Sequence, residues 1–132
     1  MKIYIDGGGK DSVMKGRYGY VIVKEEGIDY YEIKKFWKDD KITDNEVIYK
    51  AIIKLFEKML PRTTATILCS DRMIINQIQG RWIIRQAKLK NLLAIANAIS
   101  EIKQLNIKVE FIIRSQNRAT QRILELNKNE SV

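Results

Sequence analysis

The first forty residues alternate apolar and polar side chains with the period of two that is typical of β-strands. Three segments follow this pattern and are rich in β-branched and aromatic residues: Met1–Asp6, Arg17–Lys24 and Ile28–Trp37. Glycines end the first two segments, at Gly7-Gly8-Gly9 and at Gly27. The sequence therefore predicts three strands, of which the second and third form a hairpin.

From Thr43 onward the apolar positions recur every three or four residues, which is the period of a helix. Thr43-Asp44-Asn45-Glu46 fits a capping box, in which a threonine hydroxyl and a glutamate carboxylate satisfy free amides of the first turn. This pattern predicts an amphipathic helix that ends before Pro61. Its apolar positions are Ile48, Ile52, Leu55 and Met59.

The rest of the chain continues as alternating strands and helices. The patterns predict a buried strand at Thr64–Ser70, a short helix at Asp71–Gln79 closed by Gly80, a long helix at about 86–105, a strand at Ile107–Ile113, and a last helix to about Asn127 that is capped by Asn117 or Ser115. The order βββ-α-β-α-α-β-α predicts one α/β domain over residues 1–132. We expect a mixed five-stranded sheet, with three antiparallel and two parallel strands, flanked by helices.

Composition excludes several classes of function. Apolar residues make up 45% of the 132 residues and charged residues 30%, which is a globular balance. The chain has no histidine, so a Ser-His-Asp triad and a histidine-ligated zinc site are excluded. No apolar run approaches the roughly 20 residues that span a bilayer, and the charged start at Lys2 argues against a secretory signal. Because Cys69 is the single cysteine, we expect a reducing, cytoplasmic location.

The charge balance points to an anionic partner. Lysine and arginine number 24 and the acids 16, which gives a net charge of +8. Such an excess favours nucleic acid or an anionic membrane surface, and we expect nucleic acid and no membrane insertion. The alternative is a soluble, lysine-rich protein without a polyanionic partner.

Four short motifs lie at the ends of the predicted elements. They are Ile3-Tyr4-Ile5-Asp6-Gly7-Gly8 in the first strand, Thr43–Ile52 at the start of the first helix, Ser70–Trp82 after the fourth strand, and Arg114-Ser115-Gln116-Asn117 before the last helix. In this order they resemble the ribonuclease H family in its short bacterial and archaeal type, over nearly the whole chain. The resemblance implies a ribonuclease H-like fold and a two-metal hydrolase that cuts the RNA strand of RNA–DNA hybrids.

In that family four carboxylates gather at one edge of the sheet and hold the metal ions. The resemblance implies that Asp6 and Asp71 are two of the four, as catalytic residues and metal ligands. Two divalent ions about 3.5–4 Å apart repel each other strongly, so they need anionic oxygens around them.

The other two carboxylate positions are substituted. The helix position directly before Tyr49 is Ile48. The position in the last helix is Gln121, four residues after Asn117, or Thr120 in the adjacent register. Because neither register supplies a carboxylate, the resemblance implies a degenerate site.

Because two of the four carboxylates are missing, we expect at most one Mg²⁺ or Mn²⁺ beside Asp6 and Asp71, or no ion at all. Three other acids are candidate replacements. Asp44, Glu46 and Glu125 each also have a structural explanation: a charge at a helix start, a capping-box partner and a solvated helix charge.

The resemblance also implies a nucleic-acid-binding surface. Its candidate residues are Asn45, Asn76, Gln77, Gly80, Arg81, Trp82, Arg85 and Lys88. Amides suit the minor groove of a hybrid, where they meet 2′-hydroxyls and base edges, and basic side chains follow phosphates. Each group has a structural alternative: a solvated helix end for the amides, a solubilising face for the cations, and a core position for Trp82.

We therefore expect a ribonuclease H-like protein that binds an RNA–DNA hybrid or structured RNA and has lost efficient hydrolysis. The first alternative is an active metal-dependent nuclease for hybrids. The second is a structural subunit that contacts other proteins.

Overall fold

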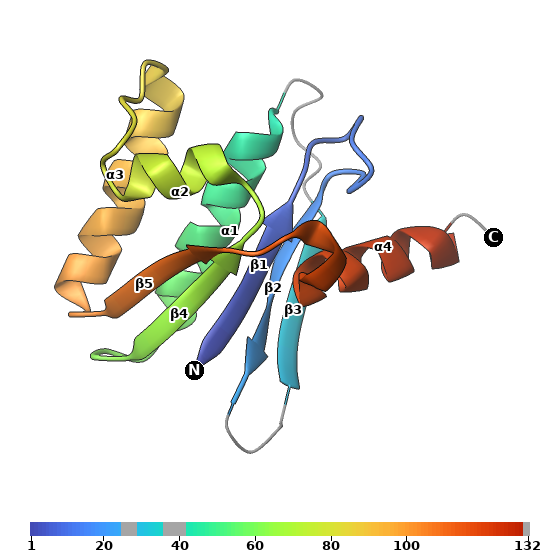
Figure 1. The fold of residues 1–132 in the computed structure, drawn as a ribbon, viewed down its shortest axis with the longest axis horizontal. Helices are drawn as coiled ribbons and strands as arrows, with labels where there is room; N and C mark the ends of the chain where they lie inside the picture. Colours follow the sequence, from blue (N-terminus) through green and yellow to red (C-terminus); the bar gives the residue numbers. More distant parts are fainter. Residues whose placement is uncertain (25–28, 36–41, 131–132) are drawn as a thin grey trace.

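The computed structural model describes residues 1–24, 29–35 and 42–130 (Figure 1). Five strands form one sheet in the order β3-β2-β1-β4-β5. Their bounds are β1 Lys2–Gly7, β2 Arg17–Val23, β3 Asp29–Lys35, β4 Thr64–Cys69 and β5 Asn106–Phe111. Pairs β1–β2 and β2–β3 are antiparallel, whereas β1–β4 and β4–β5 are parallel. The predicted mixed sheet is confirmed; the ends of the predicted third strand, at Ile28, Phe36 and Trp37, lie outside the described residues.

The register of the sheet brings two distant motifs to the same edge. Ile5 of β1 pairs with Cys69 of β4 in the parallel sense. Asp6 and Asp71, which follow these two residues by one and two positions, are therefore carried to the carboxyl ends of neighbouring strands. Such an edge is where sites form in sheets with parallel strands.

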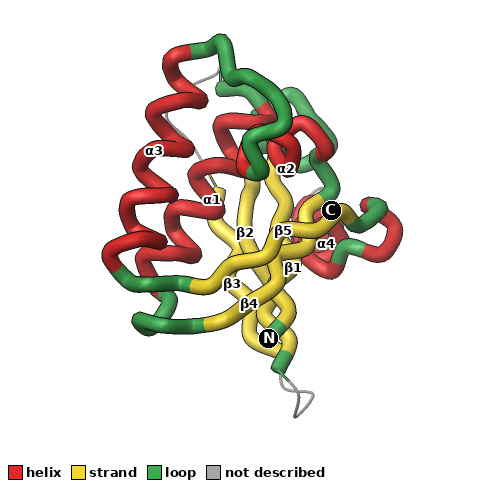
Figure 2. The backbone as a smooth tube through the Cα atoms, turned by 60° about the vertical axis from the view of Figure 1, so that its left-hand side comes forward, coloured by secondary structure: helices red, strands yellow, loops and turns green. Residues whose placement is uncertain are grey.

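The helices form layers on both faces of the sheet (Figures 1 and 2). Their bounds are α1 Asp44–Lys58, α2 Arg72–Ile78, α3 Ala87–Ile102 and α4 Arg118–Glu130, with a 3₁₀ turn, η1, at Arg114–Gln116. Helix α1 packs on β1 and β2, and α3 packs on α1. Helix α4 lies against β1, β2 and β3 on the opposite face. Among the described residues, none of the helices is long and apolar enough to span a bilayer.

Helix α1 begins and ends where the sequence predicts. The hydroxyl of Thr43 accepts a hydrogen bond from the backbone N–H of Glu46 at 3.3 Å, as a helix cap requires. At the other end, the ammonium of Lys103 donates to the carbonyl oxygens of Phe56, Glu57 and Met59. The buried face of α1 fills the space between the sheet and α3.

Helix α3 is shorter than the predicted 86–105, because the chain turns out of the helix at Gln104. Gln104 has a φ of +54°, and the N–H of Leu105 donates to the carbonyl of Ser100. This is the hydrogen bond of a Schellman ending, which satisfies carbonyls of the last turn. Gly80 ends α2 in the same left-handed region, with a φ of +75°, so the predicted glycine stop is confirmed.

Helix α4 is fastened near its carboxyl end by Asn127. Its amide donates to the carbonyl of Val13, and its side-chain oxygen accepts from the guanidinium of the buried Arg17. These contacts connect α4 to the loop between β1 and β2.

Candidate active site and nucleic-acid interface

Asp6 lies at the carboxyl end of β1 and is almost completely buried, with 1% of its surface exposed. Its Oδ1 accepts a hydrogen bond from the backbone N–H of Gly7 at 2.9 Å. Its Oδ2 accepts a short hydrogen bond from the hydroxyl of Thr120 on α4. A buried carboxylate needs such donors, because it has lost its hydration.

Arg114 supplies the positive charge beside Asp6. Its Nε lies 3.4 Å from Oδ2 and its Nη2 lies 3.5 Å from Oδ1, so one edge of the guanidinium faces both carboxylate oxygens. The guanidinium has the orientation of a bidentate arginine–carboxylate pair, at distances longer than those of an ordinary hydrogen bond. The Asp6 carboxylate is 1% exposed and the Arg114 side chain 48%, so the pair extends from the interior to the surface.

Asn117 holds this corner of the fold together. It is completely buried, and its amide donates to the carbonyl of Ile5 and to the hydroxyl of Ser70, both at 3.0 Å. Its side-chain oxygen accepts from the backbone N–H groups of Ala119 at 3.0 Å and of Thr120 at 3.5 Å. The predicted helix cap at Asn117 is confirmed, and the residue also ties α4 to β1 and β4.

The two residues that the sequence left open for the last helix, Thr120 and Gln121, have different surroundings. Thr120 is buried and contacts Asp6. Gln121 is exposed, and its amide donates to the carbonyl of Ser115 at 3.0 Å. Gln121, the first choice from the sequence, stays a prediction for the fourth carboxylate position, and of the two residues only Thr120 is seen to contact Asp6. The reason is that Asn117 caps the helix through Ala119 and Thr120, which sets the rotation of its first turn.

Ile48 belongs to the hydrophobic core. It is 1% exposed and lies on the buried face of α1 with Tyr49. Burial and the charge of Asp71 raise the pKa of the Tyr49 phenol. The phenol therefore stays protonated, and its hydroxyl donates to the amide oxygen of Gln77 at 2.7 Å.

Asp71 acts as the cap of α2. Its Oδ1 accepts a hydrogen bond from the backbone N–H of Ile74 at 3.1 Å. The thiol of Cys69 lies beneath it, 4.0 Å from the Asp71 carbonyl oxygen. Burial raises the pKa of the Cys69 thiol to about 12, and the charges of Asp71 and Asp6 act in the same direction. The thiol is therefore neutral, and Cys69 belongs to the hydrophobic core.

The side chains present do not fit a two-metal centre. Within residues 1–24, 29–35 and 42–130, no group of three or more acidic, histidine or cysteine side chains converges as metal ligands do. Both oxygens of Asp6 are bound by protein donors, and Ile48 contributes only hydrocarbon. Two dications would meet one free carboxylate oxygen, at Asp71, and the charge of Arg114.

The three acids considered as replacements have other partners. Asp44 accepts a hydrogen bond from the backbone N–H of Gly9 at 2.7 Å. Glu46 is buried, and its carboxylate lies 3.6 Å from the ammonium of Lys88. Glu125 is exposed and lies 3.7 Å from a guanidinium nitrogen of Arg122.

The predicted binding surface lies between α2 and α3. Trp82 is 53% exposed, which excludes the core alternative. The cationic residues of the segment, Arg81, Arg85 and Lys88, are exposed as well. Ile83, which the sequence analysis did not single out, is 86% exposed, whereas Ile84 is buried and fixes the segment to the core. In the sequence, the only indication that Ile83 belongs to this surface was its position beside Trp82.

The amides predicted to contact nucleic acid differ in exposure. Asn45 and Asn76 are partly exposed, and Asn76 donates to the carbonyl of Arg72. Gln77 is buried, and its side-chain oxygen accepts a hydrogen bond from Tyr49. That oxygen is therefore not available to the predicted binding surface. The sequence could not reveal this, because it shows no partner for a polar residue in a helix.

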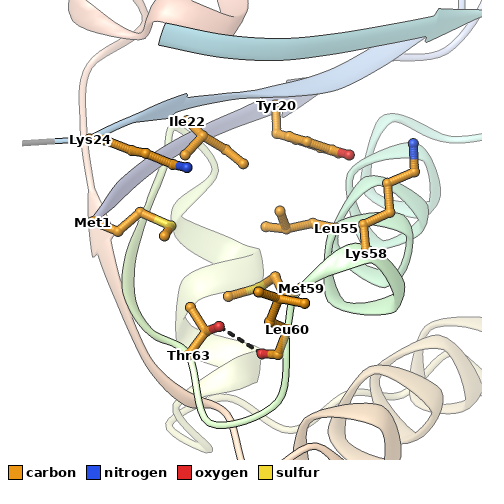
Figure 3. A pocket seen from close by; sticks show the side chains of 9 residues that line it. All are labelled: Met1, Tyr20, Ile22, Lys24, Leu55, Lys58, Met59, Leu60 and Thr63. Atoms are coloured by element: carbon orange, nitrogen blue, oxygen red, sulfur yellow. Dashed lines mark hydrogen bonds between the residues drawn. The ribbon is translucent and has the colours of Figure 1, made fainter. Parts of the chain in front are cut away.

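A separate cavity of about 480 Å³ lies at the opposite end of β1 (Figure 3). Its walls are mostly apolar: Met1, Ile22, Leu55, Met59 and Leu60, with Tyr20, Lys24, Lys58 and Thr63 at polar positions. Beside it, Glu32 accepts hydrogen bonds from Tyr20 and Lys58 and lies 3.1 Å from the Lys34 ammonium. Burial raises the pKa of Glu32, but these donors outweigh it and lower the pKa to about 2.

Comparison with known proteins agrees with the geometry. Residues 5–123 match the model of a family described as reverse transcriptase-like. No curated protein sequence matches the chain significantly. Among solved structures, LC11-RNase H1 bound to an RNA/DNA hybrid superposes with a TM-score of 0.78 at 20% identity, over 98% of this chain and 97% of that one.

Two further solved structures share the fold. RNase H1 of Halobacterium salinarum gives a TM-score of 0.72 at 14% identity, over 98% of this chain and 97% of that one. The N-terminal RNase H domain of a Mycobacterium tuberculosis protein, solved as a fusion with maltose-binding protein, gives 0.70 at 19% identity, over 99% and 97%. The chain therefore belongs to the reverse transcriptase-like family, and its fold is that of the ribonuclease H domains.

Proposed function

We propose that this protein binds an RNA–DNA hybrid or structured RNA through its ribonuclease H-like fold and does not hydrolyse it efficiently. One observation carries the proposal: both carboxylate oxygens of Asp6 accept hydrogen bonds, from Gly7 and Thr120, and the guanidinium of Arg114 lies beside them. Two-metal hydrolysis needs free anionic oxygens at this position, because the ions must be held close together. Ile48 and Thr120 at the other two positions add none.

The exposed segment between α2 and α3 supports binding. Trp82 offers an aromatic face and Arg81, Arg85 and Lys88 offer positive charge. The net charge of +8 favours a polyanion in general. LC11-RNase H1 was solved with an RNA/DNA hybrid, and its likeness in fold makes a hybrid the first ligand to test.

The site as proposed holds no more than one divalent ion. Asp71 keeps one carboxylate oxygen outside its helix cap, and a single Mg²⁺ or Mn²⁺ commonly uses one or two carboxylates together with substrate phosphate. The buried single thiol, Cys69, is in keeping with the reducing, cytoplasmic location that we propose.

The test combines a binding assay with a cleavage assay. We expect the parent protein to bind a short RNA–DNA hybrid with an affinity that falls steeply with salt, and to leave its RNA strand intact in Mg²⁺ and in Mn²⁺. Cleavage by the parent that Asp6→Asn abolishes would contradict the proposal. A lack of binding even at low salt would favour the structural-subunit alternative.

Restoring the lost carboxylates gives a positive control. Ile48→Glu combined with Thr120→Asp is expected to create cleavage that the parent lacks. Ile48→Glu combined with Gln121→Asp is the matched control, because Gln121 is exposed and does not contact Asp6. Equal activity of the two double variants would contradict the assignment of Thr120 to the fourth position.

A further inference from the structure

We propose that Arg114 replaces the metal charge at Asp6 and binds a backbone phosphate of the nucleic acid, so that binding needs no divalent ion. This inference rests on the proposed function, since it names the group that contacts phosphate where the family holds its metal ions. The observation behind it is the pairing of an exposed guanidinium with a completely buried carboxylate.

One edge of the guanidinium is used inside the protein and the other is available outside. Nε and Nη2 face the two oxygens of Asp6, at 3.4 and 3.5 Å. The Nη1 group points to the opposite side of the planar guanidinium, and 48% of the side chain is exposed. Arginine commonly binds phosphate through such a pair of N–H groups.

The backbone around Arg114 is held firmly. Its carbonyl accepts a hydrogen bond from the N–H of Asn117 at 3.1 Å, and the buried Asn117 side chain is tied to Ile5 and Ser70. The carbonyl of the next residue, Ser115, accepts from the amide of Gln121. The guanidinium is therefore positioned before any ligand arrives, which reduces the entropy that binding costs.

The pairing with Asp6 also opposes a metal ion. A buried carboxylate without a counter-ion is unstable, and Arg114 already balances its charge. A dication at Asp6 would have to displace the guanidinium or lie close to it against strong repulsion. Asp6 therefore has a positioning role, because its carboxylate holds the guanidinium of Arg114.

Two more arginines make this surface attractive to phosphates. Arg118 lies 5.7 Å from the ring of Tyr4, which is on the same face of β1 as Asp6. Arg72 lies 3.7 Å over the ring of Phe111, at the end of β5. With Arg114 they place three cationic side chains around the strand ends that carry Asp6 and Asp71.

The experiment measures the affinity of the full chain for a short RNA–DNA hybrid over a range of salt, in EDTA and in Mg²⁺. The parent is expected to bind equally well in both. Arg114→Ala should weaken binding about tenfold and make the slope of log K against log salt shallower by about 0.7–0.9, the value of one lost phosphate contact. Arg114→Lys should keep the slope and lose part of the affinity, because lysine keeps the positive charge but lacks the pair of N–H groups that a guanidinium presents to phosphate.

The matched control is Arg62→Ala. Arg62 is an exposed arginine between α1 and β4, at the end of the sheet away from Asp6, and its side chain contacts Gln104. Its removal changes the net charge by the same amount and should leave the slope unchanged. Because Arg114→Ala leaves Asp6 uncompensated, the double variant Asp6→Asn/Arg114→Ala separates folding from binding. It should bind as weakly as Arg114→Ala although it carries no buried charge.

A metal titration gives an independent readout. In the variant Asp71→Asn, which leaves Asp6 as the carboxylate at this edge of the sheet, Mn²⁺ is expected to cause no selective broadening of the amide NMR signal of Gly7. Selective broadening of that signal would overturn the proposal that Arg114 replaces the metal charge at Asp6. If the parent binds the hybrid and Arg114→Ala binds it equally well with the same slope, the phosphate contact is overturned while the proposed function stands. If the parent fails to bind, the proposed function itself fails.

Discussion

The hydroxyl of Tyr49 donates a hydrogen bond of 2.7 Å to the amide oxygen of Gln77, and it joins α1 to α2 beneath the candidate site. Tyr49 directly follows Ile48, the position where we propose that a carboxylate has been lost. Both side chains are buried, so the bond is shielded from water. Polar residues that suggest a binding role in the sequence can thus serve to hold two helices together.

Tyr49→Phe is expected to lower the free energy of unfolding by about 1–2 kcal/mol, because it leaves the Gln77 oxygen buried without its donor. Urea denaturation measures this loss. The affinity for a hybrid should change less than twofold. A tenfold loss of affinity without loss of stability would show that Gln77 acts at the binding surface after all.

Asn117→Ala is expected to be among the most destabilising single changes in the chain, at about 2–4 kcal/mol. It removes a helix cap and the amide donor that the Ile5 carbonyl and the Ser70 hydroxyl share. Thermal denaturation followed by circular dichroism tests this. Gln116→Ala, at an exposed position one residue earlier, is the control and should cost less than about 0.5 kcal/mol.

Acid should weaken the protein through Glu32. The pKa of this carboxyl is about 2 in the folded state, below its usual value, so its ionised form stabilises the fold. The contribution is complete above the unfolded pKa and is lost as the pH falls towards 2. We expect it to be about 1–2 kcal/mol, because the partner lysines are half exposed.

Glu32→Gln tests this contribution. It should lower stability at pH 7 and make stability depend less on pH between about 4.5 and 2, as measured by urea denaturation at each pH. Glu110→Gln is a suitable control, since Glu110 is exposed and contacts only the exposed Lys108 among the pairs described here. The same pH dependence in both variants would contradict the role of Glu32.

Trp82→Ala is expected to weaken hybrid binding about tenfold or more with little effect on stability. The indole is 53% exposed, and aromatic contacts to nucleic acid commonly contribute about 1–3 kcal/mol. Fluorescence anisotropy measures the affinity. Ile102→Ala, at a still more exposed apolar position in the last turn of α3, should bind like the parent.

Local patterns were sufficient to predict the elements of the fold. The alternation in Met1–Asp6 and the cap at Thr43 depend on neighbours within a few residues, and the structure has the strand and the helix that they predict. The end of α3 was wrong by three residues, because a glutamine adopted the left-handed conformation that favours glycine. The motifs have an isoleucine at position 48 and aspartates at positions 6 and 71, and the site roles drawn from them stay predictions.

Contacts between distant segments could not be predicted in the same way. Arg114 and Asp6 are 108 positions apart, and only the assembled sheet edge brings them together. The choice between Gln121 and Thr120 depends on how Asn117 caps α4, which is a matter of three-dimensional geometry. The exposure of Trp82 was undecided for a similar reason, since indole side chains occur both in cores and at surfaces.

The seclusion of Cys69 makes the chain convenient for site-directed spectroscopy. The residue is 1% exposed and its thiol stays protonated at any ordinary pH, so maleimides and nitroxide reagents will not modify it in the native protein. A second cysteine placed on the surface would therefore be the one reactive attachment point. Dyes or spin labels can be introduced without first removing the natural thiol from beneath the sheet edge.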